Sequence, residues 1–252
     1  MPSDVVTGVY FQPRGEGPYP AALILHHSGG SFEAEAMIAR HLASNGVVAL
    51  TIDMSNYGPR RKPGTHTGFL EGDDPAAIQM GFRQSVLDAR RAADFLRSRP
   101  EVDPSRVCVG GISLGAIIGA TAAGVDPRFA RAVLVIGGGD LGRVIATAGE
   151  AAKARQLLAA KGIDPELFAK GLATVDPITF ADRMRADDVL MLNATKDEVI
   201  PRESTLALWR RAGCPEIRWF ECGHYGMVAH VVDILSAMLD HFRSKAPERE
   251  RW

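Results

Sequence analysis

The sequence predicts an α/β fold in which helices cover both faces of a mostly parallel central sheet. Short apolar runs rich in β-branched residues alternate with longer segments of helical spacing through most of the chain. The run "YPAALILHH" is apolar enough for a strand that is buried on both faces, as the strands of parallel sheets are. This alternation predicts a single layered domain over residues 1–252.

The composition is that of an ordinary globular domain. The chain has 252 residues, of which 46% are hydrophobic and 23% are charged, which is enough for one sizeable core. The net charge of −1 gives no reason to expect nucleic acid or an anionic membrane as a partner. No apolar run is long enough to span a membrane, and no signal peptide is visible. The three cysteines cannot all pair, so we expect reduced thiols and a cytoplasmic protein.

The first half of the chain supplies three predicted strands and two predicted helices. The strands are expected over residues 5–12, 19–27 and 46–53. A helix over residues 33–45 ends at Gly46, the residue type that most often closes a helix. Residues 59–81 are rich in Gly, Pro and charged residues and predict an irregular loop. A long helix over residues 82–99 then stops before Pro100.

The second half continues the same alternation. Strands are predicted over residues 106–109, 130–139, 187–195 and 216–222, and helices over residues 114–123, 202–212 and 227–243. Residues 140–184 have helical spacing throughout, and Asp164 followed by Pro165 is typical of a helix start. We therefore expect residues 140–184 to form a small helical cap inserted into the domain.

The stretch "SRVCVGGISLGAIIGATAA" places the pattern Gly-x-Ser-x-Gly between a predicted strand and a predicted helix. A serine on a sharp strand-to-helix turn is crowded, and Gly111 and Gly115 remove the side chains that would clash there. The turn exposes the hydroxyl at a helix N-terminus, where free N–H groups can stabilise an oxyanion. The pattern favours Ser113 as a nucleophile over the alternative, a serine in an ordinary glycine-containing loop.

Two further reactive residue types follow later strands. In a parallel sheet, functional residues collect in the loops at the carboxyl ends of the strands. Asp197 follows one predicted strand and His224 follows the next, which gives the chain order serine, acid, histidine. Glu198 is the competing carboxylate, and a surface-loop position is the alternative for His224. This order predicts a triad in which His224 is the base and Asp197 orients it.

These motifs together resemble those of the α/β-hydrolase superfamily, and most closely its dienelactone-hydrolase-like and acetyl-xylan-esterase-like branch. The resemblance covers almost the whole chain, from the "ALILHHSGG" strand to the last helix. It implies the α/β-hydrolase fold. It also implies that Ser113 is the nucleophile, that Asp197 in "KDEVIP" is the acid and that His224 in "CGHYG" is the base.

The resemblance also places the oxyanion hole. His26 matches the histidine that opens the family's oxyanion stretch, and His27 stands where glycine is usual. Ser28 then matches the position that donates a backbone N–H, and the second donor is expected to be the N–H of Leu114. Adjacent histidines on a strand end point to opposite faces and no cysteine or carboxylate cluster accompanies them. We therefore expect neither a metal nor an organic cofactor.

Four residues near the strand ends are candidates for substrate contact: His27, Tyr57, Arg60 and Tyr225. Arg60 belongs to a basic cluster that could recognise an anionic group, and a solvated loop is the alternative. Tyr57 either lines the pocket or packs under its loop.

Taken together, the residues predict hydrolysis of a small-molecule carboxylic ester with a short acyl chain, because the few large apolar residues of the cap would be used to seat it. The alternatives are a thioesterase, a peptidase or a sugar deacetylase with the same triad. A non-catalytic homologue that binds a ligand is a further alternative. The oligomeric state is left open.

Overall fold

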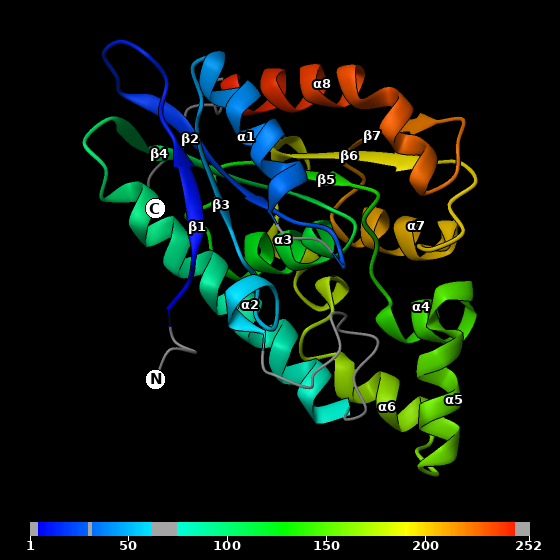
Figure 1. The fold of residues 1–252 in the computed structure, drawn as a ribbon. Coiled ribbons are helices and arrows are strands. Elements are labelled where there is room, and N and C mark those ends of the chain that lie inside the picture. The colour runs from blue at the N-terminus through cyan, green and yellow to red at the C-terminus, as the bar shows by residue number, and fades with distance from the viewer. Residues whose placement is uncertain (1–4, 30–31, 62–74, 245–252) are drawn as a thin grey trace.

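A seven-stranded sheet forms the centre of the molecule. The structure, a computed structural model, describes residues 5–29, 32–61 and 75–244. The strand order is β1-β3-β2-β4-β5-β6-β7 (Figure 1). β1 (Gly8–Phe11) runs antiparallel to β3 (Val48–Ile52), and every other neighbouring pair is parallel. The predicted mostly parallel sheet is confirmed.

The remaining strands fill the middle and the far edge of the sheet. They are β2 (Tyr19–Leu25), β4 (Val102–Ile112), β5 (Ala132–Val135), β6 (Val189–Ala194) and β7 (Glu216–Phe220). Every residue of β5 and β6 is buried, which is the consequence of helices on both faces. Because these strands are parallel, their carboxyl ends lie at one edge and bring the loops that follow them together.

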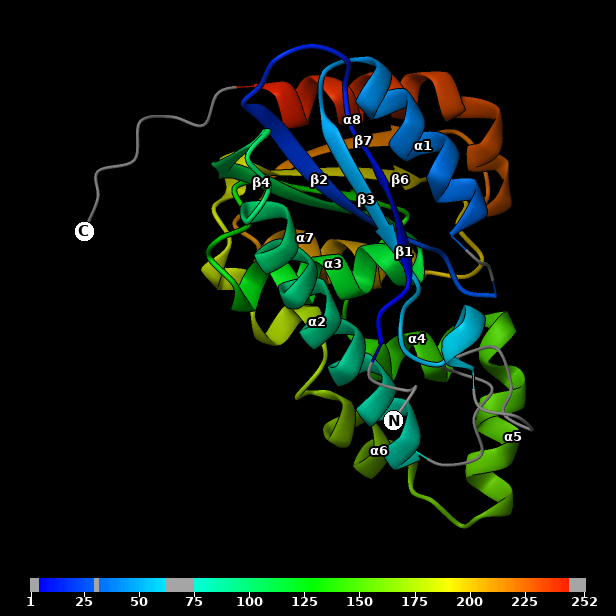
Figure 2. The ribbon, with the colours of Figure 1, turned by 60° about the vertical axis from the view of Figure 1, so that its left-hand side comes forward.

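Helices cover the sheet on both faces, as the turned view also shows (Figure 2). One face carries α1 (Glu33–Ser44) and α8 (Val231–Arg243), and the other carries α2 (Pro75–Arg97), α3 (Leu114–Val125) and α7 (Arg202–Arg211). On the first face, Leu42 of α1 and Phe242 of α8 belong to one buried cluster with side chains of the sheet. An ideal Cβ at Gly110 would lie 3.0 Å from the Phe242 ring, so this glycine leaves room for it.

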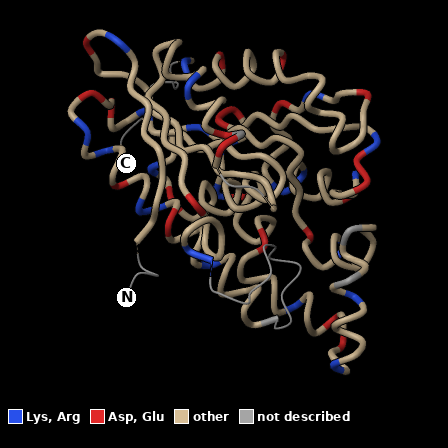
Figure 3. The backbone as a smooth tube through the Cα atoms, viewed as in Figure 1, with Lys and Arg blue, Asp and Glu red and all other residues tan. Residues whose placement is uncertain are grey.

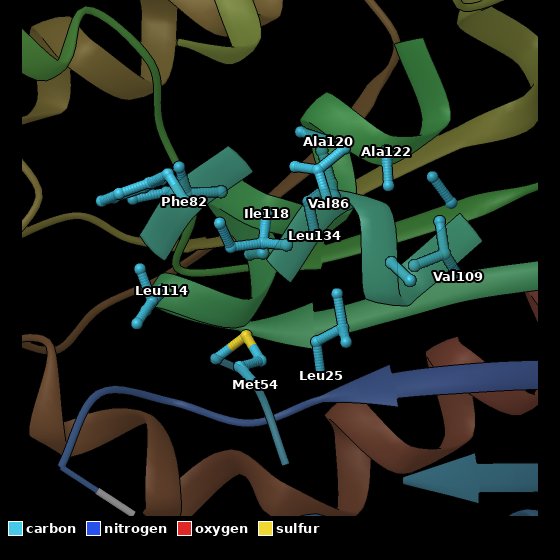
Figure 4. Packing of buried hydrophobic residues seen from close by; sticks show 14 of the residues in the cluster. Leu25, Met54, Phe82, Val86, Val109, Leu114, Ile118, Ala120, Ala122 and Leu134 are labelled. Atoms are coloured by element: carbon cyan, nitrogen blue, oxygen red, sulfur yellow. The ribbon is translucent and has the colours of Figure 1, made fainter. Parts of the chain in front are cut away.

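The larger apolar cluster lies on the other face. Figure 4 shows Phe82 of α2 and Ile118 of α3 packed with Leu25 and Leu134 of the sheet. Leu114, the first residue of α3, joins the same cluster and is 7% exposed. The helix that begins directly after Ser113 is therefore fixed by apolar packing at its first residue.

Residues 140–184 are mostly helical. They contain α4 (Leu141–Thr147), α5 (Ala152–Ala160) and α6 (Pro165–Leu172), with short 3₁₀ turns between and after them. Asp176 ties the two ends of the segment together, because its carboxylate accepts the N–H groups of Asp140, Leu141 and Ile178. Gln79 of α2 donates to the Gly171 carbonyl and to the Thr174 hydroxyl, both at 2.7 Å, which fastens α6 to α2.

The long helix begins earlier than its composition suggests. The expected loop over residues 59–81 is wrong at its carboxyl end, because α2 starts at Pro75, and its first residues belong to the short 3₁₀ turn Gly58–Arg60. Residues 62–74 lie outside the described residues. Ile78 is buried with Phe82 in the same cluster, so the apolar face of α2 extends a full turn before Phe82. Proline at the first helical position lacks only an N–H that has no intrahelical acceptor.

Two other elements also differ in extent from the predictions. The closing helix was expected from residue 227, but Tyr225–His230 is a 3₁₀ segment and α8 begins at Val231, since tighter turns are frequent at helix starts. The strand before Ser113 is longer than expected, running over Val102–Ile112.

The charged residues of both signs are interspersed along the described chain (Figure 3). No helix in the described ranges is both long enough and apolar enough to cross a membrane.

Truncating the ring that joins α8 to the sheet tests the packing. Phe242 is 1% exposed, whereas Val232 on the same helix is 75% exposed. We expect Phe242→Ala to lower the free energy of unfolding by about 3–5 kcal/mol and Val232→Ala to change it by less than about 0.5 kcal/mol. Urea unfolding of the two variants beside the wild type measures both values. Similar effects at the two positions would contradict the packing of α8.

Candidate active site

Ser113 sits on a strained turn between β4 and α3. Its backbone angles are φ +53° and ψ −113°, a combination that L-residues rarely adopt. The Ser113 N–H donates to the Val135 carbonyl at 2.9 Å, which holds the turn against the end of β5. The geometry is that of the strand-turn-helix elbow that the sequence predicts.

The two flanking glycines are required by the closeness of three backbone segments. An ideal Cβ at Gly115 would lie 2.1 Å from the Leu25 carbonyl oxygen and 2.8 Å from that of His26. An ideal Cβ at Gly111 would lie 2.2 Å from the Gly115 carbonyl oxygen. The predicted crowding is confirmed. The same distances show that the chain leaving β2 packs directly on the first turn of α3.

His224 lies between the serine and an acid. Its Nε2 is 3.0 Å from the Ser113 Oγ, and its Nδ1 is 2.9 and 2.8 Å from the two carboxylate oxygens of Asp197. These partners assign the tautomer, because a carboxylate can only accept and the serine hydroxyl can donate. Nδ1 carries the hydrogen, and Nε2 is the acceptor for the Ser113 O–H. The structure thus brings together the three residues that the chain order singled out.

The two neighbouring carboxylates do different things. Asp197 contacts the imidazole, and its Oδ1 also accepts the N–H groups of Val199 and Ile200 at 2.9 and 2.7 Å. Glu198, which competed for the acid position, instead accepts the backbone N–H of His224 at 2.9 Å. An ideal Cβ at Gly223 would lie 2.6 Å from that carboxylate, so the glycine lets the two loops meet. Sequence reasoning missed this second role of the acidic pair.

Three consecutive residues after β2 are each held by a different segment. His26 is fully buried, and its Nε2 accepts the Met54 N–H at 3.2 Å while its Nδ1 bonds the His27 carbonyl oxygen at 2.8 Å. Because a carbonyl only accepts, the proton is on Nδ1 and the ring is neutral. Burial lowers the pKa of His26 below its ordinary value, which agrees with a neutral ring.

The next two residues bind α1 and the loop after β3. Both the backbone N–H and Nδ1 of His27 contact one carboxylate oxygen of Glu35, at 3.1 and 2.9 Å. The Ser28 hydroxyl lies 3.2 Å from the Tyr57 hydroxyl, and the Tyr57 ring packs edge-on against His26. Sequence reasoning missed Glu35, whose only signal is an acidic residue in the first turn of the helix after this loop.

The backbone N–H groups of Ser28 and Leu114 are the two predicted oxyanion donors. Among the described residues, neither the Ser28 N–H nor the Leu114 N–H has an acceptor in the protein. Leu114 directly follows Ser113 at the N-terminus of α3, and Ser28 belongs to the loop that packs on this helix turn. Backbone donors of this kind stabilise negative charge without needing to reorient.

The four candidates for substrate contact separate into two groups. Tyr57 is 2% exposed and packs under the loop, which is the second of the two places that the sequence left open for it. The Arg60 side chain is 5% exposed and pairs with the buried Asp88 at 2.7 Å. Its guanidinium also binds the Asp53 carbonyl, so it holds the loop and is not a free cation at the rim. His27 and Tyr225 remain accessible: the His27 side chain is 42% exposed, and Tyr225 is 66% exposed with its ring 5.5 Å from that of His224.

The adjacent histidines after β2 are engaged by protein groups. His26 binds two backbone groups and His27 binds Glu35. No cluster of three or more metal-ligating side chains occurs within the described ranges.

Comparison with known proteins places this chain in a family. The acetyl xylan esterase (AXE1) family model matches residues 2–233. The acetyl xylan esterase of Paenibacillus sp. R4 superposes with a TM-score of 0.78 at 26% identity, over 93% of this chain and 79% of that one. Acetyl xylan esterase 1 of Thermoanaerobacterium sp. JW/SL YS485 gives a TM-score of 0.77 at 24% identity, over 94% and 79% of the two chains. The predicted α/β-hydrolase fold and the resemblance to this branch are confirmed.

Similarity to curated sequences is more local. A putative hydrolase of Bacillus subtilis (strain 168) is 28% identical over 129 residues, which are 46% of this chain and 42% of that protein. The match therefore spans less than half the length of this relative.

Adding one methyl group to the elbow tests its crowding. Gly115→Ala would place a Cβ 2.1 Å from the Leu25 carbonyl oxygen, whereas a Cβ at Gly119 on the same helix meets nothing nearer than 3.5 Å. We expect Gly115→Ala to lower the melting temperature and to abolish fluorophosphonate labelling of Ser113. Gly119→Ala should label normally and, with better helix propensity, gain up to about 1 kcal/mol of stability. Labelling and thermal melts check both variants, and a normally reactive Gly115→Ala protein would contradict the account.

Proposed function

The chain belongs to the acetyl xylan esterase family, and from this membership we propose that it hydrolyses a small-molecule carboxylic ester through Ser113, His224 and Asp197. The observation that carries the proposal is the unbroken line of hydrogen bonds from the Ser113 hydroxyl through both ring nitrogens of His224 to the Asp197 carboxylate. A protein that only binds a ligand does not require this line, which speaks against a non-catalytic homologue.

Acylation follows from the direction of these bonds. The Ser113 oxygen attacks the ester carbonyl carbon while its proton moves to His224 Nε2, 3.0 Å away. Asp197, held by its own backbone donors, stabilises the imidazolium that forms. When the tetrahedral intermediate collapses, Nε2 gives the proton to the leaving oxygen, the carbon–oxygen bond to the alcohol breaks and the acyl group stays on Ser113.

Deacylation repeats the sequence with water. His224 takes a proton from a water molecule whose oxygen attacks the acyl carbon, and then returns the proton to Ser113 as the carboxylic acid leaves. In both halves the carbonyl oxygen becomes negatively charged. The Ser28 and Leu114 N–H groups would bind that oxygen, and each such donor contributes about 3–4 kcal/mol to the transition state in comparable sites.

We propose a short acyl group because little apolar surface of residues 140–184 remains available. Phe168 and Leu172 of α6 are 7% and 2% exposed, and Leu158 of α5 is 6% exposed; all three belong to the main apolar cluster. Leu157 of α5 is partly exposed and Leu167 of α6 is 67% exposed, so these two are the exceptions. On this proposal, residues 140–184 form a cap on a single domain. Most of the large apolar side chains of the cap pack against the rest of the domain and so cannot line an acyl pocket.

Substitution of each carboxylate separates the two roles in the acidic pair. We expect Ser113→Ala to lower kcat for p-nitrophenyl acetate about 10⁶-fold and Asp197→Asn to lower it about 10⁴-fold. Glu198→Gln should cost far less, because its amide oxygen can still accept the His224 N–H. Steady-state kinetics of the three variants measure these losses in kcat, and far-ultraviolet circular dichroism checks that each variant is folded. Undiminished turnover by Ser113→Ala, or a larger loss in Glu198→Gln than in Asp197→Asn, would refute these assignments.

A series of esters tests the acyl preference. Each methylene buried in a matching pocket would add about 0.8 kcal/mol of binding, and we expect no such gain here. The kcat/KM for p-nitrophenyl acetate or butyrate should exceed that for the decanoate at least about tenfold, or roughly 1.4 kcal/mol in transition-state stabilisation. The measurement covers esters of two, four, eight and ten carbons. A flat or rising series would show that residues 140–184 do not limit the acyl site.

A further inference from the structure

A buried carboxylate lies behind the loop that carries the proposed oxyanion donor. Glu35, in the first turn of α1, is 0% exposed. Its Oε1 receives two bonds from one residue, the backbone N–H of His27 at 3.1 Å and the His27 Nδ1 at 2.9 Å. Its Oε2 has no hydrogen-bond partner among the described residues.

Burial of this group costs stability unless its bonds compensate. Removing a carboxylate from water is expensive, and leaving one oxygen unpaired adds to the cost. The start of α1 offsets part of it, because a helix N-terminus favours negative charge. The bond from Glu35 also raises the pKa of the His27 imidazole, and a hydrogen bond to an ionised carboxylate is stronger than one between neutral groups. Both hydrogen bonds that Glu35 accepts come from one loop residue, His27.

The bonds fix the two peptide planes on either side of the His27 Cα. The first plane contains the His27 N–H, which Glu35 holds. The second contains the His27 carbonyl and the Ser28 N–H, and its carbonyl is held by His26 Nδ1 at 2.8 Å. Because a trans peptide is planar with its N–H opposite its C=O, holding the carbonyl sets the direction of the Ser28 N–H. With both planes held, the loop has no free backbone rotation at His27.

We propose that Glu35 is a positioning residue that, through His27, aims the Ser28 N–H at the oxyanion. This inference rests on the proposed function, since it needs Ser28 as a donor to the reacting carbonyl oxygen. Loss of an oxyanion donor costs about 10²–10³-fold in kcat in comparable enzymes, and a misplacement of about 1 Å can cost about 10²-fold. Substrate in its ground state depends much less on this donor, so KM should change little.

The test uses Glu35→Ala and Glu35→Gln, with Glu33→Gln as the matched control. Glu33 lies in the same helix turn and is exposed, and it makes no hydrogen bond or ion pair to the described residues of the loop. The first readout is the second-order rate constant for modification of Ser113 by a fluorophosphonate, whose phosphoryl oxygen needs the same donors as the oxyanion. This rate does not depend on which ester the enzyme uses. The second readout is kcat and KM for p-nitrophenyl acetate, and thermal melts establish folding.

We expect Glu35→Ala to lower the labelling rate and kcat in parallel by about 100-fold with KM within about threefold of the wild-type value. Glu35→Gln should restore part of the rate, because its amide oxygen accepts both bonds at about half the strength, and Glu33→Gln should match the wild type. A folded Glu35→Ala protein that labels within threefold of the wild-type rate overturns the inference. If that variant does not fold, Glu35→Gln decides, since a loss of less than threefold contradicts it. A different outcome separates the two proposals. If Glu35→Ala slows labelling of Ser113 but the wild-type protein hydrolyses none of the esters, the inference stands and the proposed function is refuted.

Discussion

The proposed catalysis depends on holding the His224 imidazole between the Ser113 hydroxyl and the Asp197 carboxylate. His224 must keep its hydrogen on Nδ1, which donates to Asp197, so that Nε2 can accept the hydrogen bond from Ser113. The three residues follow three different strands, so the distances between them depend on the whole parallel sheet and on the helices that bury it. Ser113 follows β4, Asp197 follows β6 and His224 follows β7, and the sheet places these strands close together in the order β4-β5-β6-β7. Backbone bonds then set each loop: Ser113 to Val135, and the loop before His224 to the chain that leaves β6.

The same principle, backbone fixed by neighbouring segments, governs the opposite wall of the site. The chain leaving β2 packs so closely on the first turn of α3 that Gly115 has no space for a side chain. Beyond that contact, His26, His27 and Ser28 each bind a different partner. The partners are buried or nearly so, and electrostatic groups that are already oriented stabilise a developing charge without reorganisation. The strained φ of Ser113 is tolerated because contacts on all sides determine it.

Local patterns in the sequence predicted the strands, the helices and the elbow, because each depends on a short period or on a fixed spacing. The positions of Ser113, Asp197 and His224 after three predicted strands then indicated which reactive residues belong together. Contacts between distant segments were beyond such patterns. Arg60 looked like a free cation in a basic loop, but Asp88, 28 positions later in the chain, pairs with it in the interior. The first turns of α2 were assigned to a loop because the preceding residues are rich in Gly and Pro. Ile78 nevertheless belongs to the buried face of the helix. Glu35 could not be identified as a partner of His27, because only the folded backbone brings the start of α1 to that loop.

The most direct test of this account is a crystal structure of the protein after reaction with a fluorophosphonate, which leaves a tetrahedral group resembling the transition state of acyl transfer. The account predicts phosphorus bonded to the Ser113 Oγ, with one phosphonyl oxygen about 2.7–3.1 Å from both the Ser28 and the Leu114 nitrogen. His224 should remain bonded to Asp197. A phosphonyl oxygen that points to solvent or to other donors, or an adduct on a different residue, would contradict the arrangement on which the proposed catalysis depends.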